Sequence, residues 1–199
     1  MITSYLAAEV KAFGGMFPVY VHTIEHPDGL VLVDTGMIDS RPELDEAWGP
    51  VPHPLPAALI SRVDRVINTH LHFDHCGGNR LFPGVPIHVQ ARELSDARTQ
   101  EDYTIPEWVD FGGASYVEHE GEAEILPGVS VLPAPGHTDG HHIVLVETEE
   151  GPVVLGGDVA YSFRELGEGK TEGQRLVLEL GVLTWLAHAE RPQVPRRTS

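Results

Sequence analysis

The sequence contains a single cysteine, Cys76, among 199 residues. An intramolecular disulfide is therefore excluded, which is compatible with a reducing compartment. No apolar run approaches the roughly 20 residues that a membrane-spanning helix needs. The first residues lack the basic segment and continuous apolar stretch of a secretory signal. We therefore expect a cytoplasmic protein with no membrane partner.

Basic residues are scarce, since 13 Lys and Arg stand against 30 Asp and Glu, giving a formal net charge of −17. Such a surface repels polyanions unless a local basic patch overrides it. The basic cluster that stands out is Arg196-Arg197, near the end of the chain. We expect no nucleic-acid partner, and a solvated acidic surface accounts for most of the charge.

Strand-like segments recur along the chain. Residues 17–24 and 30–33 form a hairpin whose second, continuously apolar strand is expected to be buried on both faces. Further strands are expected at 63–68, 87–90, 115–119, 129–133, 142–148, 152–156 and 182–187. Helices are interspersed without strict alternation. This pattern favours an αββα sandwich, in which two mixed sheets pack face to face with helices outside, over a doubly wound parallel sheet.

Helix signals are clearest near the end of the chain. Thr171 followed by Gln174 resembles a capping box, and Gly181 would end the helix that it begins. The expected helices are 57–62, about 91–98, and about 172–180.

The remaining segments are expected to be loops. Residues 37–55, rich in Pro and acids, are interpreted as a loop with little regular structure. Residues 99–115 form either a substrate-facing loop or an aromatic plug at the edge of the core. We expect one domain over residues 1–199 with a frayed tail at 189–199.

Histidine is abundant, with 12 residues, and three of them fall within residues 70–75. Clustered histidines can bind metal or act as a pH switch. In an extended segment, alternation would place three ligands on one side and direct Leu71 and Phe73 into the core. The last ligand would join them if the chain turned at the glycines 77–78. The four metal-capable side chains of this segment are His70, His72, Asp74 and His75.

Three other strand ends carry a potential ligand. His137 follows strand 129–133, Asp158 follows strand 152–156, and His188 follows strand 182–187. Imidazole and carboxylate groups suit zinc, and also iron or manganese. A chance cluster of surface histidines would need neither the apolar alternation nor the glycines.

These residues, in this order, resemble the metallo-β-lactamase superfamily over about residues 17–188, because His-x-His-x-Asp-His is complete at 70–75. The resemblance implies two divalent metal ions, with zinc as the first choice. Asp34 and His141 match positions that support the site from behind. The implied ligands are His70, His72 and His137 for one ion, Asp74, His75 and His188 for the other, and Asp158 as a bridge between them.

Within the superfamily the sequence most resembles the quorum-quenching N-acyl-homoserine lactonases. Residues 17–37, residues 70–79 and Asp158-Val159-Ala160-Tyr161 carry this resemblance. It implies a hydroxide, shared by two metals, that opens a lactone or cleaves a carboxylic ester of a small molecule. Tyr161 would donate a hydrogen bond to the carbonyl oxygen, unless it is merely a packed core aromatic. Asp74 would also pass a proton to the leaving alkoxide, and the family makes a homodimer plausible.

The sequence departs from lactonases in two regions that shape the pocket there. The segment before residue 17 and the interval 158–188 are both short, which leaves the acyl-chain preference open. Cys76 is either a soft extra ligand or, as we prefer, a small buried residue. Surface or structural roles are expected for six other histidines: His22, His26, His53, His88, His119 and His142.

Other functions fit less well. A glyoxalase II-like thioesterase would share the ligands but usually adds a basic helical region after the position of His188. A phosphodiesterase is disfavoured by the acidic charge, and a β-lactamase usually varies the residue at position 74. A non-catalytic metal-binding protein is also disfavoured, because structural zinc sites usually have four ligands and no open position.

Overall fold

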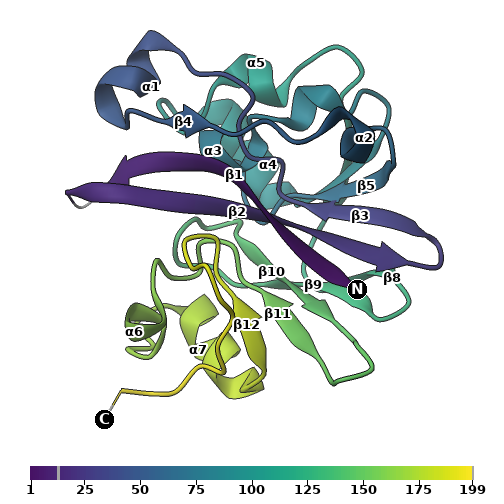
Figure 1. Ribbon diagram of the computed structural model, residues 1–199, viewed down its shortest axis with the longest axis vertical. Coiled ribbons are helices and arrows are strands. Elements are labelled where there is room, and N and C mark those ends of the chain that lie inside the picture. Colours follow the sequence, from purple (N-terminus) through teal and green to yellow (C-terminus); the bar gives the residue numbers. More distant parts are fainter. Residues whose placement is uncertain (13, 199) are drawn as a thin grey trace.

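The computed structural model describes residues 1–12 and 14–198. Phe13 and Ser199, the last residue of the expected tail, lie outside the described residues. Two mixed β-sheets pack face to face, with helices over both outer faces (Figure 1). This is the αββα sandwich that the sequence predicts.

The first sheet has seven strands in the order β4-β1-β2-β3-β5-β6-β7. Antiparallel pairing joins β4, β1, β2 and β3, whereas β3, β5, β6 and β7 are parallel neighbours. The strands are β1 (Ile2–Ala12), β2 (Gly15–His26), β3 (Gly29–Val33), β4 (Val51–Pro52), β5 (Val63–Ile67), β6 (Pro86–Gln90) and β7 (Ser115–His119).

The second sheet has five strands in the order β12-β11-β10-β9-β8. Its strands are β8 (Ala123–Leu126), β9 (Val129–Pro133), β10 (His142–Val146), β11 (Val153–Leu155) and β12 (Leu183–Trp185). β10 is antiparallel to both β9 and β11, and β12 is parallel to β11. The strands β9, β11 and β12 therefore run in one direction and end at the same edge of the sheet.

The helices are divided between the two outer faces (Figure 1). Those before β7 lie on the side of the first sheet, and α6 and α7 lie on the side of the second. They are α1 (Pro42–Ala47), α2 (Ala57–Ile60), α3 (Phe73–Cys76), the 3₁₀-helix η1 (Asn79–Leu81), α4 (Ala91–Thr99), α5 (Pro106–Val109), α6 (Phe163–Leu166) and α7 (Glu172–Leu180).

Alternation along the strands builds the layers. Val31 and Val33 of β3 meet β10 and its neighbours between the two sheets. Leu30 and Leu32 face the opposite way, into the cluster beneath α2. Ile143 of β10 likewise turns away from the sheet interface and packs with side chains of α6 and α7. Because β3 is apolar on both faces, it is buried on both sides, as its sequence predicts.

The capping-box prediction is confirmed. The Thr171 hydroxyl accepts a hydrogen bond from the Gln174 backbone N–H at 3.1 Å, and the Gln174 side chain caps the Thr171 N–H in return. Gly181 ends α7 with a φ of 60°, a left-handed conformation that glycine adopts without strain.

Several local expectations are wrong. β1 was not expected, because a β-bulge between Leu6 and Ala8 interrupts its alternation. The segment 37–55 is not a structureless loop, since it contains α1 and β4, and α1 begins at Pro42, where a proline is well tolerated. β8 and α6 also went unpredicted, and β10, β11 and β12 are shorter than the segments expected for them.

The described residues of the tail, which the sequence leads us to expect as frayed, form hydrogen bonds with the rest of the chain. Gln193 pairs with Thr184, and their backbone groups exchange two hydrogen bonds of 3.0 Å. The Thr198 N–H donates to the Gly167 carbonyl at 2.9 Å. These bonds hold the tail against the second sheet and α6. In the described parts of the chain, no helix combines the length and the apolar character that crossing a membrane requires.

The glycines after the histidine cluster are needed for close packing rather than for an unusual backbone angle. Gly78 has a φ of −91°, which any residue can adopt. A Cβ at this position would lie 2.5 Å from the Thr35 carbonyl oxygen. The loop that carries the cluster therefore packs directly on the backbone after β3.

We predict that Gly78→Ala lowers the free energy of unfolding by about 1–3 kcal/mol, because the methyl group overpacks a backbone contact. Gly112→Ala is the matched control, since a Cβ there would meet no atom within 4 Å. Urea denaturation of both variants measures the difference. Equal stability of the two variants would show that Gly78 is not needed for this approach.

Candidate metal centre

The potential ligands come together from distant parts of the sequence because of strand direction. The segment from His70 to His75 follows β5, whereas His137, Asp158 and His188 follow β9, β11 and β12. Those three strands of the second sheet end at one edge, beside the end of β5 in the first sheet. The donor atoms of these residues form three overlapping groups, within each of which all donor atoms lie within 4.8 Å of one another.

The segment after β5 turns earlier than the sequence suggests. His72 has extended backbone angles, but α3 begins at the next residue, and the His75 and Cys76 N–H groups donate to the His72 carbonyl at 3.0 Å. Asp74 is therefore in a helical turn and not on an extended strand. The turn brings Asp74 and His75 toward the other ligands.

The two apolar residues of the segment behave differently. Leu71 is fully buried, as expected. Phe73 was expected in the core, but it is only partly buried and lines the cavity described below. It also packs with Trp48 after α1, with ring centroids 6.0 Å apart.

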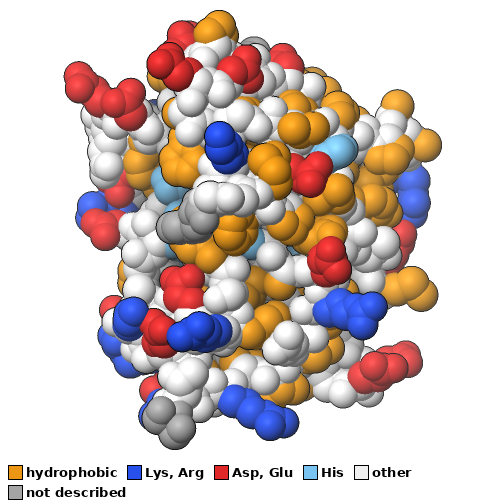
Figure 2. All heavy atoms as spheres, turned by 60° about the vertical axis from the view of Figure 1, so that its left-hand side comes forward, with side chains coloured by type: hydrophobic (Ala, Val, Ile, Leu, Met, Phe, Trp, Pro, Cys, Tyr) orange, Lys and Arg blue, Asp and Glu red, His pale blue; other side chains and the backbone are white. Residues whose placement is uncertain are grey.

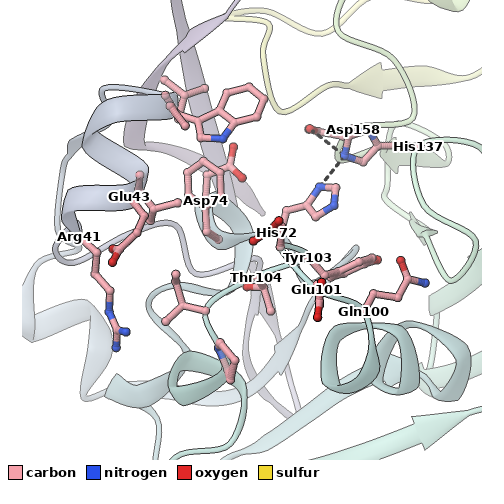
Figure 3. Close-up of a pocket in the computed structure, with 18 of the residues that line it drawn as sticks. Arg41, Glu43, His72, Asp74, Gln100, Glu101, Tyr103, Thr104, His137 and Asp158 are labelled. Carbon is pink, nitrogen blue, oxygen red and sulfur yellow. Dashed lines mark hydrogen bonds and ion pairs between the residues drawn. The ribbon is translucent and has the colours of Figure 1, made fainter.

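The first group of donor atoms comprises His70, His72 and His137. Nδ1 of His72 lies 2.9 Å from Nε2 of His137 (Figure 3). The His70 ring packs edge-on against both of the others, with centroids 4.7 Å apart in each case. Three imidazoles in van der Waals contact, with nitrogens directed at one another, can hold one divalent cation.

The second group comprises Asp74, His75 and His188. Nδ1 of His188 is 2.7 Å from the Pro18 carbonyl oxygen. Because a carbonyl can only accept, Nδ1 must carry the proton, and the lone pair of Nε2 is directed at the site. His75 is oriented in the same manner, since its Nδ1 lies 2.8 Å from a carboxylate oxygen of Asp34.

Asp158 lies between the two groups. Its Oδ1 is 3.2 Å from His75 Nε2, and its Oδ2 is 3.1 Å from His188 Nε2 and 3.6 Å from His137 Nε2. His70, His75 and Asp158 also form a group of their own. The carboxylate therefore contacts ligands from both groups, which is the position that a bridging ligand needs.

Asp34 forms hydrogen bonds that orient histidines of both groups. Its carboxylate accepts hydrogen bonds of 2.8 Å from the Thr69 N–H, from the Thr69 hydroxyl and from His75 Nδ1. The Thr69 hydroxyl in turn lies 3.1 Å from His70 Nδ1 and accepts its proton. Asp34 is buried and has a φ of 60°, a strained backbone for a non-glycine residue. Such strain is typical of functional sites.

Burial and nearby charges shift the histidine pKa values in opposite directions in the two groups. Burial lowers the pKa of His70 well below its ordinary value and that of His72 to about 3, so both rings are neutral. Burial opposes the proton on His75, but the carboxylates of Asp158, Asp34 and Asp74 outweigh it and raise the pKa of His75. Asp158 likewise resists the effect of burial, because His188 and His75 hold its pKa well below the usual range.

Several buried polar atoms of the site form no hydrogen bond with the described residues. They include Nε2 of His70, and also Nε2 of His75 and Oδ1 of Asp158, which lie 3.2 Å apart as an ion pair. Leaving such atoms unsatisfied costs about 1–3 kcal/mol each. A cation bound among these lone pairs would satisfy them, so the donor set fits metal ions.

His141 and Cys76 are fully buried near these donor groups. The His141 ring lies 5.4 Å from that of His70 and is fully buried. It packs against His70, and the described residues form no hydrogen bond to its nitrogens. The Cys76 thiol is 3.3 Å from the Leu71 carbonyl oxygen, and burial raises its pKa to about 12. A thiol that rarely ionises is a poor ligand, which favours the packing role for Cys76.

A cavity of about 860 Å³ opens above these groups of donor atoms. In Figure 2, histidine side chains are visible among hydrophobic side chains on this side of the molecule. His72, Asp74 and Asp158 lie at the base, and Arg41, Glu43 and Gln100 lie around them (Figure 3). The apolar part of the wall comprises Val10, Ala12, Phe17, Leu44, Ala47, Trp48, Phe73, Ile105 and Pro106.

The two interpretations of residues 99–115 each hold for part of the segment. Tyr103 lines the cavity, with its ring 4.9 Å from that of His72. Trp108 instead is buried in a core cluster, and Phe111 packs against another. The wall formed by α1 was missed altogether, although Pro42 and the acidic first turn are helix-start signals.

Tyr161 lies at the edge of the first group. Its hydroxyl is 3.3 Å from His137 Nδ1, and its ring centroid is 5.2 Å from that of His188. Burial and the nearby carboxylates of Asp158 and Asp74 raise the pKa of Tyr161. The phenol is therefore protonated at neutral pH and lines the cavity as a hydrogen-bond donor.

Comparison with known proteins identifies the family of the chain. The metallo-beta-lactamase superfamily model matches residues 14–183. An N-acyl homoserine lactonase from a Bacillus species is 35% identical over 164 residues, which cover 73% of this chain and 65% of the relative. The chain thus spans about two thirds of the length of this curated relative.

Solved structures show the same fold. A variant of the AiiA lactonase of Bacillus thuringiensis, with N-decanoyl-L-homoserine at its active site, superposes with a TM-score of 0.79 at 26% identity. The match covers 94% of this chain and 92% of that one. AidC, a dizinc quorum-quenching lactonase, has a TM-score of 0.65 at 15% identity over 93% and 81% of the two chains. By its sequence and its fold, the chain belongs to the metallo-beta-lactamase superfamily.

Proposed function

We propose that this protein is a dinuclear metal-dependent hydrolase that opens a lactone or cleaves a carboxylic ester. One ion would be held by His70, His72 and His137, and Asp158 would bridge it to a second. Asp74, His75 and His188 complete the second site. The observation that carries the proposal is the pair of ligand groups that share one carboxylate at the base of a cavity.

The relatives point to the substrate class. Proteins named N-acyl homoserine lactonase are 34–35% identical to this chain. The cavity suits a substrate of that kind, because a polar base meets an apolar wall that can hold an acyl chain. The net charge of −17 also favours an uncharged substrate over a phosphodiester polyanion.

Two divalent cations would supply Lewis acidity and would lower the pKa of bound water from about 15.7 toward 7. The protein's own side chains would supply the protons that the reaction needs. Tyr161 carries a proton that it can donate to the carbonyl oxygen as negative charge develops there. Asp74 lines the cavity beside Asp158 and Tyr161, where its carboxyl group could pass a proton to the leaving alkoxide.

We propose zinc as the first candidate for both ions, because imidazole and carboxylate donors with an open position are typical of catalytic zinc sites. Iron and manganese remain alternatives for the same donors. A reducing compartment such as the cytoplasm suits the chain, since its single buried thiol can form no internal disulfide.

A substrate panel tests the reaction type. We expect the metal-loaded protein to open an N-acyl-homoserine lactone, with weaker turnover of a simple ester. S-lactoylglutathione and bis-p-nitrophenyl phosphate should remain intact. Hydrolysis of the lactone, the ester and the thioester is measured from the acid released at constant pH. Cleavage of bis-p-nitrophenyl phosphate is measured from the absorbance of the nitrophenolate released. Rapid cleavage of the thioester or the phosphodiester, with no lactone opening, would refute the proposal.

Acid should remove the two metal ions in separate steps. Protons compete with metal for imidazole, and carboxylates raise the pKa of His75 and His188, whereas burial lowers that of His70, His72 and His137. As the pH falls, the ion of the second group should therefore leave first. Metal content after equilibration at decreasing pH measures this, and the step at lower pH should vanish in His137→Ala. Release of both ions in one step would contradict the assignment.

Tyr161→Phe should lower kcat for the lactone by about 10²-fold, since it removes one donor to the developing oxyanion. Metal content and KM should change little. Tyr5→Phe is the matched control, because Tyr5 packs against the core cluster beneath α2 and does not line the cavity. Turnover by Tyr161→Phe at the wild-type rate would exclude the catalytic role.

A further inference from the structure

Glu93 is a buried carboxylate close to the ligands that the reaction proposed above does not use. It lies in the first turn of α4 and is completely inaccessible to solvent. No Lys or Arg forms an ion pair with it among the residues that the structure describes. Removing an ionisable carboxyl from water is costly unless hydrogen bonds compensate, so its retention in the core calls for a specific role.

Three donors from three separate segments converge on this carboxylate. Oε1 accepts hydrogen bonds from the Leu71 N–H at 2.8 Å and from the Tyr103 hydroxyl at 2.5 Å. Oε2 accepts from the Thr138 hydroxyl at 2.6 Å. The Glu93 backbone also packs closely on the segment that contains Thr138, because a Cβ added at Gly140 would lie 2.3 Å from the Glu93 nitrogen.

Each of the three segments carries part of the site. Leu71 separates the ligands His70 and His72, so its N–H fixes the backbone between them. Thr138 directly follows the ligand His137. Tyr103 lies against the His72 ring, with centroids 4.9 Å apart, and forms part of the cavity wall (Figure 3).

We propose that Glu93 is a positioning residue, which holds the two segments carrying His70, His72 and His137 at the separation that the first metal ion requires. This inference rests on the proposed metal-dependent function of the site. Through Tyr103, the same carboxylate also holds the cavity wall against His72. No other described side chain is bonded to all three of these segments.

The donor pattern explains which replacement should preserve the function. The amide oxygen of glutamine can accept from both the Leu71 N–H and the Tyr103 hydroxyl, while its NH₂ donates to the Thr138 oxygen. Glu93→Gln therefore keeps the three connections without the charge. Glu93→Leu fills a similar volume but loses all of them.

Metal retention provides the first test, using zinc-loaded protein and a competing chromophoric chelator. We expect Glu93→Leu to release the ion held by His70, His72 and His137 at about tenfold lower chelator concentration than wild type, the range seen for residues that support metal ligands. That ion is identified as the one whose release step is missing in His137→Ala. Glu93→Gln should restore retention to near the wild-type level. Asp96→Asn is the matched control, because Asp96 is a buried carboxylate on α4 whose bond is to Arg92.

Variants that each remove one hydrogen-bond donor separate the effect on zinc retention from the effect on the cavity wall. They remain informative if Glu93→Leu does not fold. Thr138→Val removes the bond beside His137, so it should weaken zinc retention. Tyr103→Phe removes the bond that holds the cavity wall, so it should raise KM for the lactone while zinc retention stays near wild type. The opposite assignment of these two effects would overturn the proposal.

Two further results would also overturn it. One is retention of zinc by Glu93→Leu equal to that of Asp96→Asn. The other is equal loss of zinc in Glu93→Gln and Glu93→Leu, which would show that the charge matters and the connections do not. Zinc retention does not depend on turnover. A wild-type protein that binds zinc but opens no lactone would therefore refute the proposed function and leave the zinc-retention tests of Glu93 and Thr138 intact.

Discussion

The site depends on the hydrogen bonds that Asp34 makes behind the ligands. A metal ligand must present a lone pair, so each imidazole has to carry its proton on the nitrogen remote from the site. Asp34 fixes this for His75 directly and for His70 through the Thr69 hydroxyl. Because His70 belongs to one donor group and His75 to the other, a single buried carboxylate orients proposed ligands of both.

The direction of the strands brings the other proposed ligands to the same place. β9, β11 and β12 run the same way and release His137, Asp158 and His188 at one edge, where the segment after β5 meets them. Loops on a rigid scaffold can hold such groups accurately. Glu93 contacts the same segment, because its carboxylate accepts a hydrogen bond from the Leu71 N–H between His70 and His72. The donor arrangement is thus held by buried carboxylates from two different elements.

The sequence was sufficient to predict the sandwich and to bring the seven proposed ligands to notice, because apolar alternation and strand-end positions are local signals. It failed where tertiary packing overrides local pattern. The helical turn at Asp74 forms because the chain has to leave the sheet there, and the alternation of His70 and His72 conceals it. Glu93 gave no signal either, since an acidic residue in the first turn of a helix is ordinary until its three partners are known.

X-ray diffraction at a metal absorption edge tests the central claim most directly. Crystals of the purified protein should give two anomalous peaks, one among His70, His72 and His137 and one among Asp74, His75 and His188, with Asp158 between them. A single peak, or none, in a folded protein supplied with metal would contradict the account.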